Sequence, residues 1–117
     1  MHYTNRRGKQ VQIAITEHAK RRFHQRWRRM YPDKPLAIED VAAEIEKWFG
    51  HCQRVEKLSY REKVRQDRHG GDTIYFRTNA FTFIVQNGAL LTVEVSDSEL
   101  RHLNKSKFVA RFFGAKI

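Results

Sequence analysis

Hydrophobic residues recur with the period of an α-helix in the first third of the chain. Four of them, three or four positions apart, form one stripe: Ala19, Phe23, Trp27 and Met30. This spacing places side chains on one face of a helix, which can then pack on a core. Thr16 suits the N-cap position, and Pro32 cannot continue a helix. The pattern therefore predicts an amphipathic helix over residues 16–30.

A second apolar stripe of the same period follows a turn that contains Pro32 and Pro35. Its members are Ile38, Val41, Ile45, Trp48 and Phe49. Carboxylates occupy the other faces, at Glu39, Asp40, Glu44 and Glu46. Gly50 fits a helix stop. We expect a second amphipathic helix over residues 38–49, acidic where the first is basic.

The period changes to two between residues 73 and 95. Residues 73–78, 81–86 and 89–95 are rich in β-branched and aromatic side chains, and Asn87-Gly88 is a strong hairpin signal. One face of the predicted three-stranded antiparallel meander is apolar, with Ile74, Phe76, Phe81, Phe83, Val85, Leu91, Val93 and Val95. The other face carries Tyr75, Arg77, Thr82, Thr92 and Glu94, with Ile84 and Leu90 as exceptions.

The segments on either side of the meander are less regular. Residues 53–60 favour a strand, residues 61–68 are a charged run, and residues 69–72 contain two glycines typical of a turn or mobile loop. Ser96 and Glu99 match a capping box, which predicts a short helix through about residue 104.

These elements predict an α+β fold class, with two N-terminal helices packed on an antiparallel β-meander and a short C-terminal helix. The 117 residues are enough for one domain, which we expect over residues 11–117. Residues 1–10 are polar and basic, and we expect a flexible arm there.

Charge narrows the choice of partner. Twenty-three Lys and Arg against thirteen Asp and Glu give a net charge of +10, and residues 1–34 hold ten basic and two acidic side chains. A positive field of this kind attracts polyanions, and arginine matches phosphate geometry. We therefore expect a nucleic-acid partner.

Other features exclude whole classes of chemistry. The single cysteine, Cys52, rules out an internal disulfide and a thiolate metal site, and no carboxylate or histidine cluster has metal-ligand spacing. We expect no metal and no cofactor. Apolar stretches are only a few residues long, so we expect no membrane partner and a cytoplasmic location.

The basic face of the first helix contains a line formed by His18, Arg22, Arg26 and Arg29. Like charges at this spacing repel one another, so an acidic segment or a bound polyanion must offset the repulsion. Pairing with Glu39, Glu44 or Glu46 of the second helix is the structural alternative to nucleic-acid binding.

The run of residues 15–26 resembles the opening of the small DUF4258-type domains. Those domains begin with a His-Ala pair, here His18-Ala19, and have arginines about four and eight residues after the histidine, here Arg22 and Arg26. They are similar to the RelE/ParE and barnase-like group of small toxins. The resemblance, over residues 13–95, implies helices on an antiparallel sheet, RNA cleavage without a metal and a separate antitoxin chain. The long charged segment before the meander and the C-terminal extension depart from the pattern.

Metal-independent RNA cleavage needs a proton acceptor, a proton donor and cations for the developing phosphorane charge. The candidate catalytic residues are His18, Arg22, Arg77 and Glu94. His18 is the candidate general base or acid, because imidazole exchanges protons near neutral pH, and Glu94 is the alternative base. The candidate nucleic-acid-binding residues are Arg21, Arg22, Arg26, Arg29, Tyr75, Arg77 and His69.

These observations favour a small basic nucleic-acid-binding protein of RelE-like toxin type and leave open whether it is a metal-independent endoribonuclease. One alternative is a non-enzymatic nucleic-acid-binding module. The other is a phage- or plasmid-encoded regulator or inhibitor that docks its cationic face onto a host protein.

Overall fold

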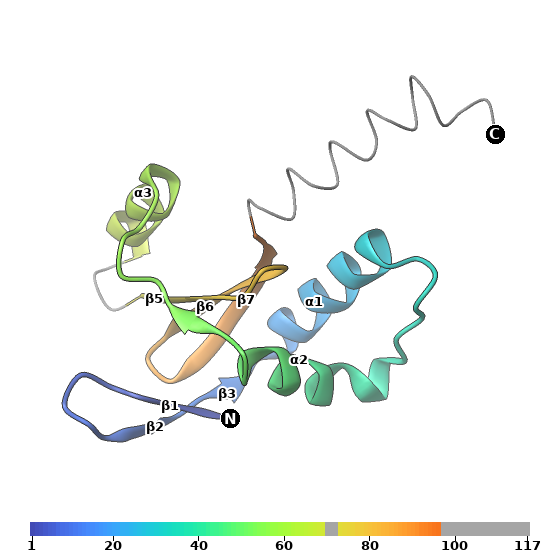
Figure 1. Ribbon diagram of the computed structural model, residues 1–117, viewed down its shortest axis with the longest axis horizontal. Coiled ribbons are helices and arrows are strands. Elements are labelled where there is room, and N and C mark those ends of the chain that lie inside the picture. Colours follow the sequence, from blue (N-terminus) through green and yellow to red (C-terminus); the bar gives the residue numbers. More distant parts are fainter. Residues whose placement is uncertain (70–72, 97–117) are drawn as a thin grey trace.

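The computed structural model describes residues 1–69 and 73–96 (Figure 1). The elements in chain order are β1 (His2–Thr4), β2 (Gln10–Gln12), β3 (Ala14–Ile15), α1 (Glu17–Met30), the 3-10 turn η1 (Ile38–Asp40), α2 (Val41–Phe49), β4 (Gln53–Arg54), α3 (Tyr60–His69), β5 (Ile74–Arg77), β6 (Phe81–Gln86) and β7 (Ala89–Val95). No helix within these two ranges is long and apolar enough to cross a membrane.

The first helix, α1, matches its prediction. The Thr16 hydroxyl accepts a hydrogen bond from the Ala19 backbone N–H (3.1 Å) and donates one to the Leu90 carbonyl (2.7 Å). The cap therefore also ties the start of α1 to β7. All four residues of the apolar stripe are buried.

The second helix begins later than predicted. Residues 38–40 form η1, and only α2 is α-helical. Because a 3-10 turn has a tighter period than an α-helix, Ile38 leaves the line of the apolar stripe and is 77% exposed. Val41, Ile45 and Phe49 are buried as predicted.

The main sheet has five strands in the order β3-β7-β6-β5-β4. Its central part is the predicted meander, in which β5, β6 and β7 pair antiparallel. Asn87 and Gly88 both have positive φ (52° and 74°), as a tight hairpin turn requires. The parallel pairing of β3 with β7 and the antiparallel pairing of β4 with β5 complete the sheet.

Helices α1 and α2 cover one face of this sheet, and the hydrophobic core lies between these two helices and the sheet (Figure 1). Phe81 is fully buried, and its ring centroid lies 4.8 Å from that of Phe23 and 5.1 Å from that of Trp48. Phe49 of α2 contacts Phe76 at 5.1 Å and Phe83 at 5.6 Å between centroids. Aromatic side chains from both helices and the sheet thus form one continuous core.

A β-bulge changes which leucine of β7 reaches the core. Ile84 pairs with Thr92 but Val85 pairs with Leu90, so Leu91 has no residue directly opposite it. Side-chain alternation restarts at such an extra residue. Leu90 is therefore fully buried and Leu91 only partly buried, and the predicted assignment of these two residues to the faces was wrong.

The predicted arrangement of elements was also wrong, although the class is α+β. A third helix, α3, lies between α2 and the meander, the main sheet has five strands, and the strand expected over residues 53–60 is limited to β4. The meander therefore does not stand alone against two N-terminal helices. The helix predicted over residues 96–104 lies, except for residue 96, outside the described residues.

A capping box begins α3. The Ser59 hydroxyl accepts from the Glu62 backbone N–H (3.2 Å), and the Glu62 carboxylate accepts from the Ser59 backbone N–H (3.0 Å). The Ser-x-x-Glu pattern that marks the start of this helix is present in the sequence. The helix itself is hard to predict, because residues 61–68 are mostly charged and contain few apolar residues that would show a helical period.

The N-terminal residues form a hairpin in which β1 pairs with β2. The Asn5 side chain accepts from the backbone N–H groups of Arg7 and Lys9 (2.9 Å each), and Gly8 adopts a φ of 78° at the tip. Tyr3 packs on Phe76 with 5.2 Å between ring centroids. This contact joins the basic N-terminal residues to the edge of the core.

Candidate nucleic-acid interface

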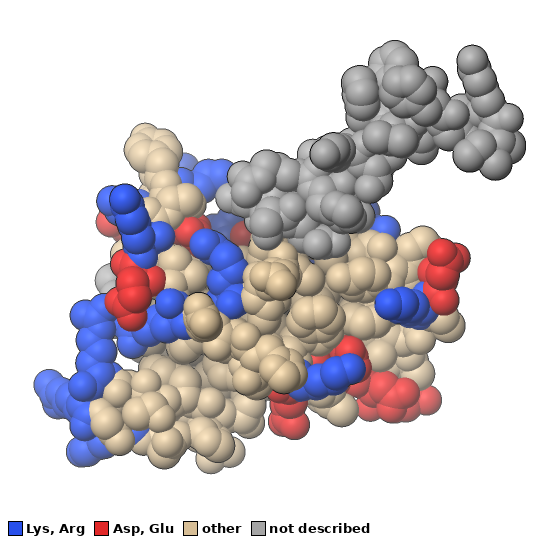
Figure 2. Space-filling view, viewed as in Figure 1, with Lys and Arg blue, Asp and Glu red and all other residues tan. Residues whose placement is uncertain are grey.

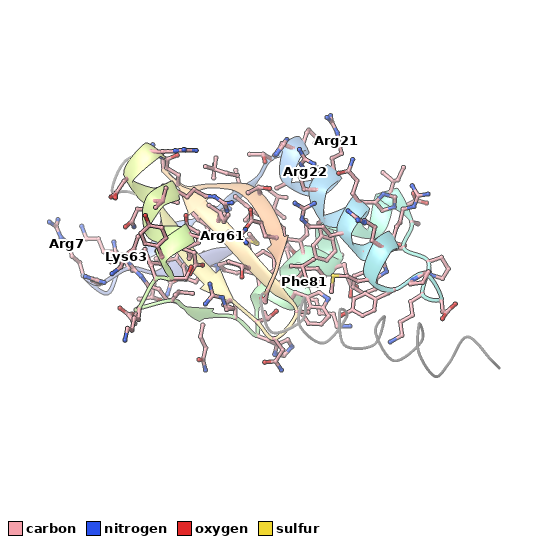
Figure 3. All side chains as sticks on the ribbon, turned by 90° about the horizontal axis from the view of Figure 1, so that it is seen from above. Arg7, Arg21, Arg22, Arg61, Lys63 and Phe81 are labelled. Atoms are coloured by element: carbon pink, nitrogen blue, oxygen red, sulfur yellow. The ribbon has the colours of Figure 1, made fainter. Side chains whose placement is uncertain are left out.

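Five arginines of α1 lack an acidic partner among the described residues. They are Arg21, Arg22, Arg26, Arg28 and Arg29. Arg26 is half-buried and the other four are exposed. Within the described residues, this group forms one polar contact, a long hydrogen bond of 3.4 Å from Arg22 to Gln25. In Figure 3, Arg21 and Arg22 project outward from α1.

The carboxylates of α2 do not compensate these arginines. Glu44 accepts from the Trp48 indole N–H (3.1 Å) and lies 3.9 Å from Lys47, while Glu46 lies 3.7 Å from the amino terminus. Glu39 is exposed and forms no ion pair with described residues. The repulsion along α1 is thus not offset by the second helix in the part of the chain that is described.

The second face of the sheet is covered by α3 and is not an open surface. Two rows of cross-strand neighbours form it: Tyr75, Ile84 and Thr92 in one, and Arg77, Thr82 and Glu94 in the other. The Tyr75 hydroxyl donates to the Glu62 carbonyl (3.4 Å), and Tyr75 is only 1% exposed. Burial raises the pKa of Tyr75 above its ordinary value. A bound strand therefore cannot reach Tyr75, which is a core residue here.

Two ion pairs join α3 to this face. Arg65 lies 2.6 Å from Glu94, and Arg77 binds Glu62 and also donates from Nε to the Thr82 hydroxyl (3.2 Å). Burial alone would raise the pKa of Glu62, but hydrogen bonds from Ser59 and the charge of Arg77 outweigh it and hold that pKa below its ordinary value. Arg77 and Glu94, both predicted as catalytic, are thus tied to α3.

Arg26 connects α1 with the second face. Burial, and then the like charge of Arg22, lower the pKa of the Arg26 guanidinium, while the Glu94 carboxylate acts in the opposite direction. These effects place Arg26 within electrostatic range of both residues. Arg61, Arg65 and Arg77 line one hollow together with Glu94, whose charge acts on Arg26. We therefore group six residues as the arginine surface: Arg22, Arg26 and Arg29 of α1, Arg61 and Arg65 of α3, and Arg77 of β5.

The space beside Glu94 is small. A hollow of about 30 Å³ is lined by Arg61, Arg65, Arg77, Glu62 and Glu94, among others. That volume holds little more than a water molecule. A phosphate group can therefore approach the arginine surface from outside, but it does not fit between α3 and the sheet in this arrangement.

The predicted catalytic residues do not all meet. His18 is exposed on the first turn of α1, and it is not among the residues that line the hollow beside Arg77 and Glu94. Arg22 lies one turn further along α1, and it is not among the residues that line the hollow where Arg77 and Glu94 lie together. His69 ends α3, and its side chain is not among those described. His24 has a structural contact, since its Nε2 lies 3.0 Å from the Leu36 carbonyl.

The arginines of α3 were missed as site residues at the level of sequence. Arg61 and Arg65 are four residues apart, so they share one side of the helix, and Arg61 lies between α3 and α1 in Figure 3. Arg61 is exposed and forms no ion pair with described residues, and Arg65 pairs with Glu94. The capping box at Ser59 was the signal that could have placed both on a helix.

Charge is unevenly distributed over the molecule. In Figure 2, Lys and Arg atoms gather over the β1–β2 hairpin and around α3, and carboxylates lie both among them and toward α2. By sequence, α1 carries one acidic and six basic side chains, while η1 and α2 together carry four acidic and one basic. Helix α1 is therefore strongly cationic, and the segment formed by η1 and α2 is acidic.

Comparison of the chain with protein-family models, with curated proteins and with solved structures gave no match. The resemblance of residues 15–26 to DUF4258-type domains therefore stays a prediction.

Proposed function

We propose that this protein binds nucleic acid through the arginine surface, as a small basic protein of RelE-like toxin type acting in the cytoplasm. The observation that carries the proposal is the set of α1 arginines without acidic partners in the described chain. Phosphate oxygens are suitable ligands for such arginines, since the guanidinium fork donates two parallel hydrogen bonds to them. The preference for RNA rests on the resemblance of residues 15–26, as does a separate antitoxin partner.

Binding is better supported than cleavage. A general base must come within hydrogen-bond reach of the proton that it removes. Glu94 is held by Arg65 at 2.6 Å beside a hollow of about 30 Å³, and His18 has no contact with Arg77 or Glu94. Cleavage would therefore require α3 to move away from the sheet, or chemistry at the exposed His18 alone.

The first experiment compares two double variants with the wild type. Arg22→Gln/Arg26→Gln removes two charges from the arginine surface, and Lys34→Gln/Lys47→Gln removes two charges outside it. Binding of a labelled single-stranded RNA is measured by fluorescence anisotropy at several salt concentrations. We expect the arginine variant to lose about tenfold or more in affinity, and its slope of log K against log salt to fall by about 1.4, because each single-strand phosphate contact contributes about 0.7.

The control pair should keep nearly wild-type affinity. Equal losses in both double variants would show that net charge alone drives binding, and absence of salt-sensitive binding to RNA and DNA would overturn the proposal. In that case a stoichiometric complex with an acidic host protein becomes the better explanation. Thermal unfolding of each variant checks that the half-buried Arg26 is not needed for folding.

Cleavage is tested in the same preparation with EDTA present. Wild type, His18→Ala and Glu94→Gln are incubated with end-labelled RNA and matched DNA. Discrete RNA products that either substitution abolishes would identify a metal-independent endoribonuclease. Intact RNA that still binds all three proteins would leave the non-enzymatic binding module.

A further inference from the structure

A second and much larger hollow lies on the other side of Arg77, next to the edge strand β4. Its volume is about 570 Å³, and the residues around it include Trp48, His51, Gln53, Arg54, Arg77 and Asn79. Pockets for small ligands fall in this size range. Neither His51 nor Arg54 is among the predicted site residues.

The charge of this hollow is positive. Two arginines line it and no carboxylate does. Arg54 is half-buried and forms no ion pair with any described residue. A partly desolvated arginine without a counter-ion favours an anionic ligand, because its interaction with a charge is screened less than at an open surface.

Arg77 reaches the same hollow in a fixed orientation. Its Nε donates to Thr82 and one of its terminal nitrogens binds Glu62, which leaves the second terminal nitrogen without a partner among the described residues. A guanidinium that is already immobilised loses little side-chain entropy when it binds a ligand. Arg54 pairs with Phe76 and Gln53 pairs with Arg77, so the two arginine side chains leave the sheet on opposite faces. Of the two, Arg54 is the one without an ion pair to any described residue, and it is therefore the arginine suited to hold an anion.

Trp48 supplies a rigid aromatic wall. Its indole N–H donates to Glu44 (3.1 Å), and its ring packs edge-on against Phe81 with 5.1 Å between centroids. The ring is half-buried, and part of it lines the hollow. Exposed aromatic rings next to cations stack nucleobases. The amide side chains of Gln53 and Asn79 add donors and acceptors suited to base edges.

We propose that this hollow binds a nucleotide, with the phosphate at Arg54 and the base against Trp48. The ligand is either a free nucleoside monophosphate or one unit of a single strand. Only the second case rests on the proposed function. Arg77 lines both this hollow and the small one beside Glu94, so a strand bound to the arginine surface would pass next to this hollow.

The two tryptophans of the chain provide a direct test. A ¹H–¹⁵N spectrum shows one indole N–H signal each for Trp27 and Trp48, and Trp48→Phe assigns them. Adenosine 5′-monophosphate is titrated first, a ten-residue single-stranded oligoadenylate second and inorganic phosphate third. We expect a saturable shift of the Trp48 signal with the nucleotide or the oligonucleotide. The Trp27 signal should change little, because the Trp27 side chain is buried, with 9% of the residue exposed.

Gln53→Glu places a carboxylate in the hollow with almost no change in size, and Gln12→Glu makes the same change at an exposed position on β2, outside the residues that line it. We expect Gln53→Glu to weaken the titrated binding by about tenfold or more and Gln12→Glu to leave it unchanged. Arg54→Gln should weaken it to a similar extent.

The outcomes separate the two proposals. Saturation by the mononucleotide supports a free ligand, and saturation by the oligonucleotide alone supports a strand unit. If the oligonucleotide binds by anisotropy but the Trp48 signal does not respond, the pocket is overturned while the proposed function stands. If the mononucleotide shifts Trp48 but no strand binds, the pocket stands and the proposed function fails. Equal affinity for phosphate alone would overturn the role of the base.

Discussion

Single arginines in this protein have one of two environments. Arg65 and Arg77 are paired with carboxylates and hold α3 on the sheet. Arg22 and Arg26 form no ion pair with described residues, and the pKa of Arg26 is lowered first by burial and then by the like charge of Arg22. Ion pairs at a surface add little to stability, and their absence removes little. Substitution of the unpaired arginines should therefore change ligand binding without unfolding the protein.

Cys52 gives a prediction at the same scale. Burial raises the pKa of this thiol to about 11, against an ordinary value of 9.0. The thiolate is the reactive form, so the folded protein should react about a hundredfold more slowly than an exposed thiol at pH 8. Reaction with a chromogenic disulfide reagent, with and without denaturant, measures this. Equal rates in both conditions would contradict the assigned burial.

The same shift makes stability depend on pH. The folded state retains the Cys52 proton at pH values where the unfolded chain has released it, so the stabilising contribution is complete below pH 9 and is lost as pH rises toward 11. Cys52→Ala should lack this component of the decline. Urea titrations of both proteins between pH 8 and pH 11 would show the difference.

At the scale of elements, α3 is the feature that the sequence conceals and the tertiary structure explains. Only ten residues long, it has Val64 as its one aliphatic side chain and is attached mainly by polar contacts. Those contacts join Glu62 to Arg77, Arg65 to Glu94, and Gln66 to the Thr73 carbonyl at 2.9 Å. A helix attached in this way carries no clear apolar stripe, so periodicity alone cannot identify it.

Glu62→Gln should loosen α3. The change removes the charge that Arg77 binds, and we expect a loss of about 1–3 kcal/mol in the free energy of unfolding at pH 7. Asp67→Asn, on an exposed position of the same helix, is the matched control and should change stability by less than about 0.5 kcal/mol. Hydrogen exchange of the α3 amides reports whether the loss is local.

The pH dependence of this pair has a defined sign. Because the pKa of Glu62 is lowered in the folded protein, its stabilising contribution is present above the ordinary value of 4.5 and is lost as pH falls below it. The difference between wild type and Glu62→Gln should therefore shrink in acid. A difference that stays constant down to pH 2 would show that the ionised carboxylate is not what stabilises α3.

The whole molecule consists of a sheet with an aromatic core on one face and a polar, arginine-rich contact layer on the other. Phe81 lies in the interior where α1 and α2 meet the sheet, and its ring contacts those of Phe23, Trp27 and Trp48 (Figure 3). Trp48 continues from this core to the large hollow beside Arg54. Packing of the core and the shape of the nucleotide pocket are thus linked through one side chain.

Phe81→Ala should destabilise the protein by about 3–5 kcal/mol, because it leaves a cavity where rings from both helices meet. Phe81→Leu keeps more of the volume and should lose less, which gives a folded variant for comparison. Ile38→Ala, at a residue that is 77% exposed, should change stability by less than about 0.5 kcal/mol. Thermal and urea unfolding measure all three, and equal effects at positions 38 and 81 would contradict this core.

The sequence by itself determined the elements whose signals are local. The stripe of α1, its Thr16 cap, the three strands of the meander and the Asn87-Gly88 turn each depend on residues within a few positions of one another. It also determined the excess of positive charge. Such features follow from backbone preference and side-chain spacing, which need no knowledge of the rest of the chain.

Only the tertiary structure decided which surfaces these elements share. Leu90 is in the core because of a bulge in a strand pair, and Tyr75 is buried because α3 lies over it. The approach of Arg26 to Glu94, and the hollow that joins Trp48, Arg54 and Arg77, likewise bring together residues far apart in sequence. Contacts of this kind depend on strand register and on how helices dock, and neither leaves a periodic trace in the chain.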